Sequence, residues 1–108
     1  FGHLILCGMG GVFVEAMKDV NAALSPLAAG EAEHMVKSLK GYPVLEGIRG
    51  QEGVDIPAFL DVLCRLSQLV SLAPEILEMD LNPLLGTRAG VMAVDARVRV
   101  ERKQNKKT

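Results

Sequence analysis

The sequence has no tryptophan, a single tyrosine and two cysteines. Cys7 and Cys64 lie far apart, lack Cys-x-x-Cys spacing and have no histidine at ligand spacing, which argues against a disulfide framework or a zinc site. We expect both to be reduced core residues of a cytoplasmic protein. The longest apolar runs, such as Leu4–Cys7 and Val91–Val94, fall far short of the ~20 residues that a membrane helix needs, so we expect no membrane partner.

The sequence also lacks the basic leader of a signal peptide, because it opens on Phe1 and no lysine or arginine precedes Leu4. We therefore expect no signal peptide, and a fragment of a longer chain. Charge is spread unevenly: residues 1–96 hold six basic and twelve acidic residues, whereas residues 97–108 hold six and one. The basic tail, 101–108, has no aromatic residue, so we expect a disordered end and no nucleic-acid partner.

The composition, 49% hydrophobic over 108 residues, is enough for a single domain with one core, which we place at residues 1–100. Leu4–Cys7 and Val12–Val14 favour strands, and Gly8–Gly11 between them predicts a tight hairpin turn. A third short strand is predicted at Ala22–Leu24, just before a proline.

Two segments have the 3.6-residue periodicity of amphipathic helices. The first begins at Glu31, and the glycines and proline of Gly41–Gly53 predict a loop after it. The second begins after Asp55, which we expect to cap it, and carries an exposed ion pair from Asp61 to Arg65. Its predicted buried stripe comprises Phe59, Leu60, Leu63, Leu66 and Val70.

The last third of the chain predicts two strands joined by a hairpin. Polar and apolar residues alternate strictly in Leu77–Asn82, which indicates a half-buried strand. Val91–Val100 alternates likewise, and Leu85–Gly90 connects the two. The predicted buried face holds Leu77, Met79 and Leu81 from the first strand and Met92, Val94, Ala96, Val98 and Val100 from the second. The whole pattern predicts an α+β fold, a mostly antiparallel sheet with two packed helices.

The polar face of this hairpin brings Asp80, Asn82 and Asp95 together if the strands pair symmetrically about the turn. Two carboxylates about 5 Å apart repel by on the order of 3 kcal/mol at an effective dielectric of about 20, which a cation would offset. Oxygen-only ligands suit Mg²⁺, which typically binds one or two carboxylates together with nucleotide phosphates. The alternative is a solvated face whose acids are neutralised by Arg97 or Arg99.

Two further segments are candidates for phosphate contacts. Gly10 and Gly11 lie in a turn whose backbone N–H groups can cradle an anion. That segment lacks both the dinucleotide fingerprint and the Gly-Lys-Ser/Thr of a P-loop, so a plain hairpin turn is the alternative. Arg49, in the glycine-rich loop, can reach a phosphate or coenzyme A, or can simply be solvated. His3 and His34 are isolated, His34 is predicted to face solvent, and the sequence shows no nucleophile–base pair.

Several short motifs cover nearly all of residues 1–100: Phe1-Gly2, Gly8 to Glu15, Lys18-Asp19-Val20, Leu24 to Leu27, Gly47 to Gly50, Asp80 to Leu84 and Val94 to Arg97. Their order and spacing resemble the ATP-grasp domain of NDP-forming acyl-CoA synthetases, relatives of the succinyl-CoA synthetase β subunit. The resemblance implies the C-terminal subdomain of that fold. It also implies that Asn82 and Asp95 hold the Mg²⁺ of the nucleotide, with Asp80 close to the phosphoryl-transfer centre.

The resemblance further implies an enzyme that interconverts acyl-CoA, ADP and phosphate with the free acid, CoA and ATP. Its partners would be the nucleotide, the rest of the ATP-grasp module, and a CoA-binding domain that carries a phosphohistidine. The first half of the module, with its nucleotide-gripping lysine, is missing from this sequence, so we expect the fragment alone to be inactive.

Two alternatives stay open. The family usually has an arginine where Ala23 stands, which favours a non-catalytic regulatory or assembly module, for example one fused to an acetyltransferase. The other alternative is a structural domain whose acidic face binds nothing.

Overall fold

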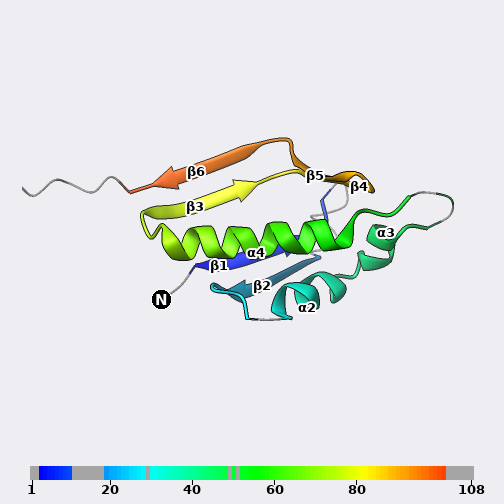
Figure 1. Ribbon diagram of the computed structural model, residues 1–108, viewed down its shortest axis with the longest axis horizontal. Coiled ribbons are helices and arrows are strands. Elements are labelled where there is room, and N and C mark those ends of the chain that lie inside the picture. Colours follow the sequence, from blue (N-terminus) through cyan, green and yellow to red (C-terminus); the bar gives the residue numbers. More distant parts are fainter. Residues whose placement is uncertain (1–2, 11–18, 29, 49, 51, 102–108) are drawn as a thin grey trace, which may run out of the picture.

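The computed structural model describes residues 3–10, 19–28, 30–48, 50 and 52–101 (Figure 1). In chain order the elements are β1 (Leu4–Gly8), β2 (Val20–Leu24), α2 (Glu31–Lys37), α3 (Tyr42–Glu46), α4 (Ile56–Leu72), β3 (Ile76–Leu81), β4 (Leu84–Thr87), β5 (Gly90–Ala93) and β6 (Ala96–Val100). The strands form three antiparallel two-stranded ribbons, β1 with β2, β3 with β6 and β4 with β5. The predicted α+β fold is confirmed. In the described part of the chain, no helix combines the length and the apolarity needed to cross a membrane.

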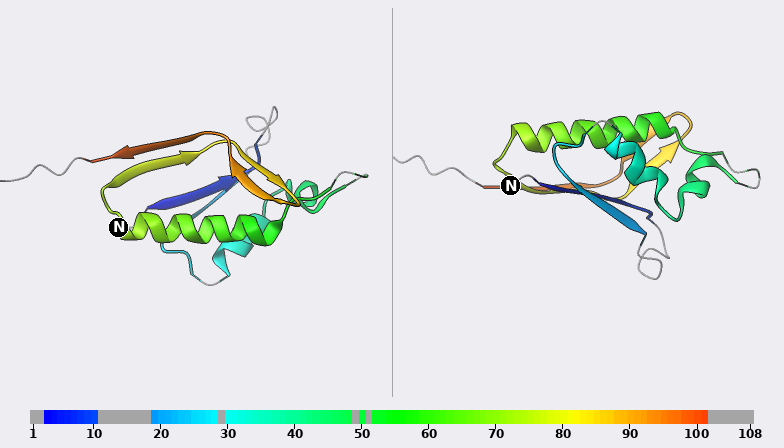
Figure 2. Two further views of the ribbon diagram at one scale, coloured as in Figure 1. Left: turned by 45° about the horizontal axis from the view of Figure 1, so that its top comes forward. Right: turned by 90° about the horizontal axis from the view of Figure 1, so that it is seen from below.

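Helix α4 runs along one side of the strands and follows its sequence signals closely (Figure 2). The Asp55 carboxylate accepts the Ala58 N–H at 3.0 Å, so the predicted cap is confirmed. Asp61 and Arg65 form the predicted ion pair, with 2.8 Å between Oδ2 and Nε. In the predicted stripe Leu63 and Val70 are buried, and Phe59, Leu60 and Leu66 are half-buried.

The core lies between α4, α2 and the covered face of β1. Its buried apolar residues are Ile5, Cys7, Ala32, Met35, Val36, Leu39, Leu63, Val70 and Ile76. Along β1 the buried Ile5 and Cys7 alternate with the exposed Leu4 and Leu6, as side chains on opposite faces of a strand must. One face of β1 therefore packs on the helices, and the other remains uncovered by the described residues.

The structure alters the prediction for the first third of the chain. The predicted strand Val12–Val14 lies outside the described residues, and the described partner of β1 is β2, with Leu4 opposite Leu24. The third predicted strand, Ala22–Leu24, is thus the one that completes this ribbon, as part of β2. Of the predicted tail, 101–108, only Glu101 is described.

The predicted loop at Gly41–Gly53 is wrong in part, because Tyr42–Glu46 forms the short helix α3. Gly41, in a turn, and Gly53, in the irregular stretch before α4, serve close packing as well as irregular structure. A Cβ on Gly41 would lie 2.6 Å from Met9 Cγ, and one on Gly53 would overlap the carbonyl oxygen of Glu46. A glycine-rich composition alone does not distinguish these two uses.

The predicted long strand Val91–Val100 is also wrong, since it is divided into β5 and β6. Its apolar side chains are exposed rather than buried, with Met92 at 68%, Val94 at 56% and Val98 at 51%. Alternation correctly indicates two faces, but no described element covers the apolar one. The predicted burial of Cys64 is wrong too, because that residue lies on the outer side of α4.

A buried carboxylate links the β1–β2 ribbon to the helices. The sequence pattern predicts no role for it. Asp19 is 3% exposed, and its two carboxylate oxygens accept the N–H groups of Lys40 and Gly41, each at 2.6 Å. Its own carbonyl oxygen accepts the N–H of Met9 at 3.0 Å. Asp19 therefore joins the ends of β1 and β2 to the junction between α2 and α3.

Replacing Asp19 by alanine should lower the free energy of unfolding by about 3 kcal/mol, because two backbone N–H groups lose their acceptor, at roughly 1–3 kcal/mol each. Urea denaturation followed by circular dichroism measures the change. Asp61→Ala is the matched control: its ion pair is exposed, and the expected loss is below about 0.5 kcal/mol. Equal losses in the two variants would contradict the role assigned to Asp19.

The two cysteines should differ in reactivity. Burial, and then the negative charge of Asp19, raise the pKa of Cys7 to about 11, so at pH 8 it remains a thiol and a poor nucleophile. Cys64 is exposed. We expect iodoacetamide at pH 8 to modify Cys64 and to spare Cys7, as read by peptide mass mapping, while both react in denaturant. Equal labelling of the folded protein would be the contrary result.

Candidate functional site

The predicted polar face is formed by the β3–β6 ribbon. The Asn82 N–H donates to the carbonyl oxygen of Asp95 at 3.1 Å, which sets these two residues directly opposite one another. Asp80 pairs with Arg97 one step further along the ladder. Because residues two apart on a strand point to the same face, Asp80 and Asn82 project to one side of β3.

Asn82 and Asp95 mark the point where one ribbon passes into the next. Beyond them the Val94 N–H donates to the carbonyl oxygen of Pro83 at 3.0 Å, and the β4–β5 ribbon begins. Pro83 has no N–H to add to a ladder, so the regular pairing is interrupted there. Both side chains of the opposed pair are exposed at this junction, where a ligand can reach them.

Arginines neutralise part of this face, as the solvated alternative predicts. Arg97 Nε lies 3.7 Å from Asp95 Oδ2, and Arg99 pairs with Glu78 at 3.2 Å. The side chains of Arg97 and Asp95 are 82% and 59% exposed, so the pair is long, screened and worth little. Asp80 makes no ion pair within 4.0 Å among the described residues.

The donor set is small. In the ranges that the structure describes, no group of three or more histidine, cysteine, aspartate or glutamate side chains is arranged to hold a metal ion. The opposed pair offers one amide oxygen and one carboxylate. A site of this kind suits a hard cation that takes its remaining ligands from water and from phosphates.

The other predicted site residues are placed only in part. Gly10 is exposed and a Cβ there would meet nothing within 4 Å, so packing does not require a glycine at that position. It lines a cavity of about 230 Å³ that is also lined by Gly86 and Val91 of the β4–β5 ribbon. The remaining two, Gly11 and Arg49, lie outside the described residues.

The two histidines differ. His34 is exposed, as predicted. His3 is not isolated: its Nε2–H donates to the carbonyl oxygen of Ile76 at 2.5 Å, from the start of β1 to the start of β3. Nothing in the local sequence indicates this contact, because the partner is 73 residues away.

Known proteins agree with this architecture. The ATP-grasp domain family matches residues 1–100. Acetate–CoA ligase [ADP-forming] I of Archaeoglobus fulgidus is 46% identical over 98 residues, which are 91% of this chain and 14% of that protein. The β subunit of acetate–CoA ligase [ADP-forming] II of Pyrococcus furiosus is 46% identical over 101 residues, which are 91% of this chain and 43% of that subunit.

A solved structure also has a similar fold. It is a dinucleotide-forming acetyl-coenzyme A synthetase 1 of Ca. Korarchaeum cryptofilum in complex with coenzyme A and Mg-AMPPCP, with its phosphohistidine segment pointing towards the nucleotide binding site. The TM-score is 0.84 at 43% identity, over 91% of this chain and 46% of that one. The chain thus spans less than half the length of each of these three relatives. By its sequence match over residues 1–100 and its shared fold, this chain belongs to the ATP-grasp domain family.

Proposed function

We propose that residues 1–100 form the Mg²⁺-nucleotide half-site of an ADP-forming acyl-CoA synthetase. The reaction converts acyl-CoA, ADP and phosphate to the free acid, CoA and ATP, through a phosphohistidine on another domain. The observation that carries the proposal is the opposition of Asn82 and Asp95, held by their backbone hydrogen bond at the junction of two ribbons. The relatives named above as ADP-forming ligases support the reaction class.

The donor set fits Mg²⁺. Asn82 and Asp95 would hold the ion through an amide and a carboxylate oxygen, and the nucleotide phosphates would complete its shell. Bound there, Mg²⁺ supplies neutralisation of phosphate charge. Asp80 projects to the same side of β3 and would act close to the transferring phosphoryl group. Such chemistry depends mainly on position and electrostatics, which a paired ribbon provides.

The remaining contacts would come from glycine-bearing segments and from other parts of the protein. Gly10 and Gly11 would offer backbone N–H groups to the phosphates, and Arg49 would offer a guanidinium. The rest of the ATP-grasp module would close over the nucleotide. A CoA-binding domain would bring the phosphohistidine, as the phosphohistidine segment and coenzyme A of the related solved structure suggest.

The non-catalytic alternative depends on Ala23. This residue pairs with Ile5 and packs half-buried against the core, on the covered face of β2. At such a position, alanine in place of arginine changes how the side chain packs against the core. The presence of alanine is therefore weaker evidence that a phosphate contact has been lost. The two ligand residues are retained, and we therefore prefer the enzyme.

The activity test uses the longest natural polypeptide that contains residues 1–108, with any partner subunit, assayed for ATP formation from acyl-CoA, ADP and phosphate in Mg²⁺. Asn82→Ala and Asp95→Asn should each lose at least about 100-fold, since even groups that only support metal ligands cost 10–100-fold. Glu75→Gln is the control: it removes one exposed acid just before β3 and should stay within about twofold.

A folded protein that forms no ATP from a panel of short and branched acyl-CoAs would contradict the proposal and favour the regulatory module. Full activity in a folded Asp95→Asn variant would instead retain the reaction and reject the metal site.

Metal binding can be tested without turnover. Mn²⁺ in place of Mg²⁺, added with ADP, should broaden the backbone NMR signals of Asn82 and Asp95 more than that of Glu75. The same titration of Asp95→Asn should need a roughly tenfold higher Mn²⁺ concentration. Uniform broadening across the ribbon would support the structural alternative, an acidic face that binds nothing specific.

A further inference from the structure

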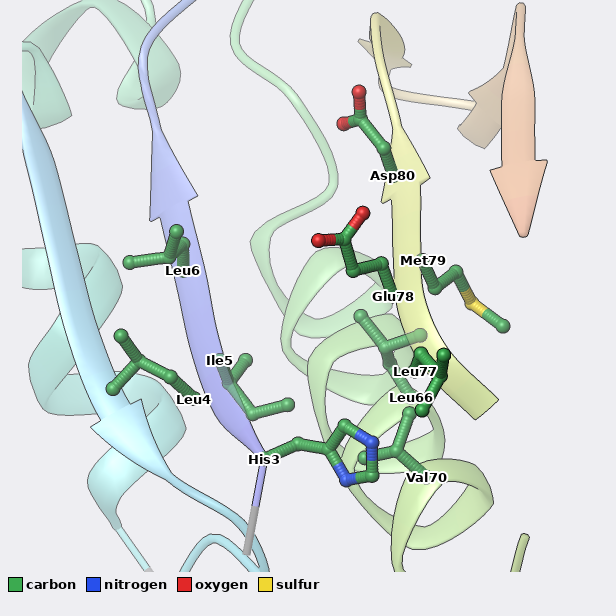
Figure 3. Close-up of a pocket in the computed structure, with 10 residues that line it drawn as sticks. All are labelled: His3, Leu4, Ile5, Leu6, Leu66, Val70, Leu77, Glu78, Met79 and Asp80. Atoms are coloured by element: carbon green, nitrogen blue, oxygen red, sulfur yellow. The ribbon is translucent and has the colours of Figure 1, made fainter. Parts of the chain in front are cut away.

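An open groove of about 490 Å³ separates β1 from β3 (Figure 3). Leu66 and Val70 of α4 lie beneath it, and residues of β1 and β3 line its two sides. The two strands run in the same direction in Figure 3, with β2 beyond β1 and β6 beyond β3. No strand pairs with the inner edges of β1 and β3 among the described residues.

The inner edge of β1 has backbone groups without strand partners. Ser25 donates its N–H to the His3 carbonyl at 2.8 Å, and Met9 donates to the Asp19 carbonyl at 3.0 Å. In an antiparallel ladder the residues that bond to the partner alternate with residues that point away from it. The N–H and C=O groups of Leu4 and Leu6 therefore point away from β2, into the groove.

The inner edge of β3 is the counterpart. The bond from Asn82 N–H to Asp95 sets the phase of the β3–β6 ladder, so Asp80 also bonds towards β6. Met79 and Leu81 then direct their N–H and C=O groups towards β1. Two rows of backbone donors and acceptors thus face one groove, with apolar side chains beneath it. Folded proteins normally pair or cover such strand edges.

The strands on the two sides are parallel, so a single strand antiparallel to both would pair with each. Direct pairing of β1 with β3 is absent, and at one end the His3 side chain spans from β1 to the Ile76 carbonyl. A side chain rather than a backbone bond therefore bridges the gap at that end. The space above His3 is left for an extended segment.

The side chains around the groove specify the segment. Leu66 and Val70 beneath require apolar residues on its lower face. On the upper face Leu4 and Leu6, 58% and 59% exposed, flank it from β1, and the carboxylates of Glu78 and Asp80 lean over the groove from β3 (Figure 3). A strand with alternate apolar residues and one or two basic or hydrogen-bonding residues on the upper face matches both sides.

We propose that this groove holds one β-strand of the same polypeptide, from a part outside residues 1–108, antiparallel to β1 and β3. The matched residues make up 14% of one of the relatives named above and 43% of the other. More than half of each of those two polypeptides therefore lies outside the match. A covalently linked segment also has the high effective concentration that strand addition needs. The added strand would join the β1–β2 and β3–β6 ribbons into one continuous sheet. This inference does not depend on nucleotide binding.

Residue-resolved hydrogen exchange on the longest natural polypeptide that contains residues 1–108 tests the proposal. The amides of Leu4, Leu6, Met79 and Leu81 should exchange within about tenfold of the amides of Ile5 and Cys7, which pair with β2 and serve as internal standards. Asp95→Asn should leave this protection unchanged, so that failure of the metal site and failure of the strand are distinguished.

Three results would overturn the proposal. The first is free exchange of the four edge amides while the two internal standards remain protected. The second is protection that rises with protein concentration, which would assign the groove to a second copy. The third is protection that appears only when a separate protein is added, which would assign it to a partner chain.

Discussion

The register of the ribbon that runs through β3 and β4 and returns through β5 and β6 decides which side chains meet at the candidate site. A slip of one residue would turn every side chain of one strand to the opposite face. The turn end holds that register: Thr87 Oγ1 accepts the Ala89 N–H at 3.1 Å, and Gly90 adopts a φ of 145°, which only glycine takes without strain. From this turn the same residue register continues across the interruption at Pro83, so that Asn82 still lies opposite Asp95.

The same turn is fixed to the helix that organises the core. Asp55 acts twice, since its carboxylate caps α4 and its N–H donates to the carbonyl oxygen of Thr87 at 3.0 Å. Gly86 permits the close approach, because a Cβ there would lie 2.7 Å from Val54 Cγ1. The start of α4 therefore positions both the apolar face that covers β1 and the hairpin that carries the polar pair. The packing of α4 on the core and the geometry of the candidate site therefore depend on the same residues at the start of α4.

Sequence reasoning succeeded where the signal is local and failed where it is not. The cap at Asp55 and the alternation around Asp80 each lie within a few residues, and both predicted the observed geometry. The pairing of β1 with β2, by contrast, joins residues 4–8 to residues 20–24, and periodicity does not indicate which segments pair. Alternation also cannot tell whether an apolar face is covered by the same domain, which is why Met92 and Val98 are exposed although the pattern predicts burial. Arg49 and Gly11 remain predictions.

Alternate residues of strand β3 face the candidate site and the groove. Asp80 bonds towards β6 and projects its carboxylate to the polar side, whereas Met79 packs against the core and turns its backbone towards β1. A strand added along that inner edge would hold the β3 backbone from both sides, which would limit how far the backbone can displace a ligand oxygen. Phosphoryl transfer depends mainly on positioned charges. Completion of the sheet would therefore fix the positions of the site residues more closely, through the backbone of β3 and without adding a side chain to the site.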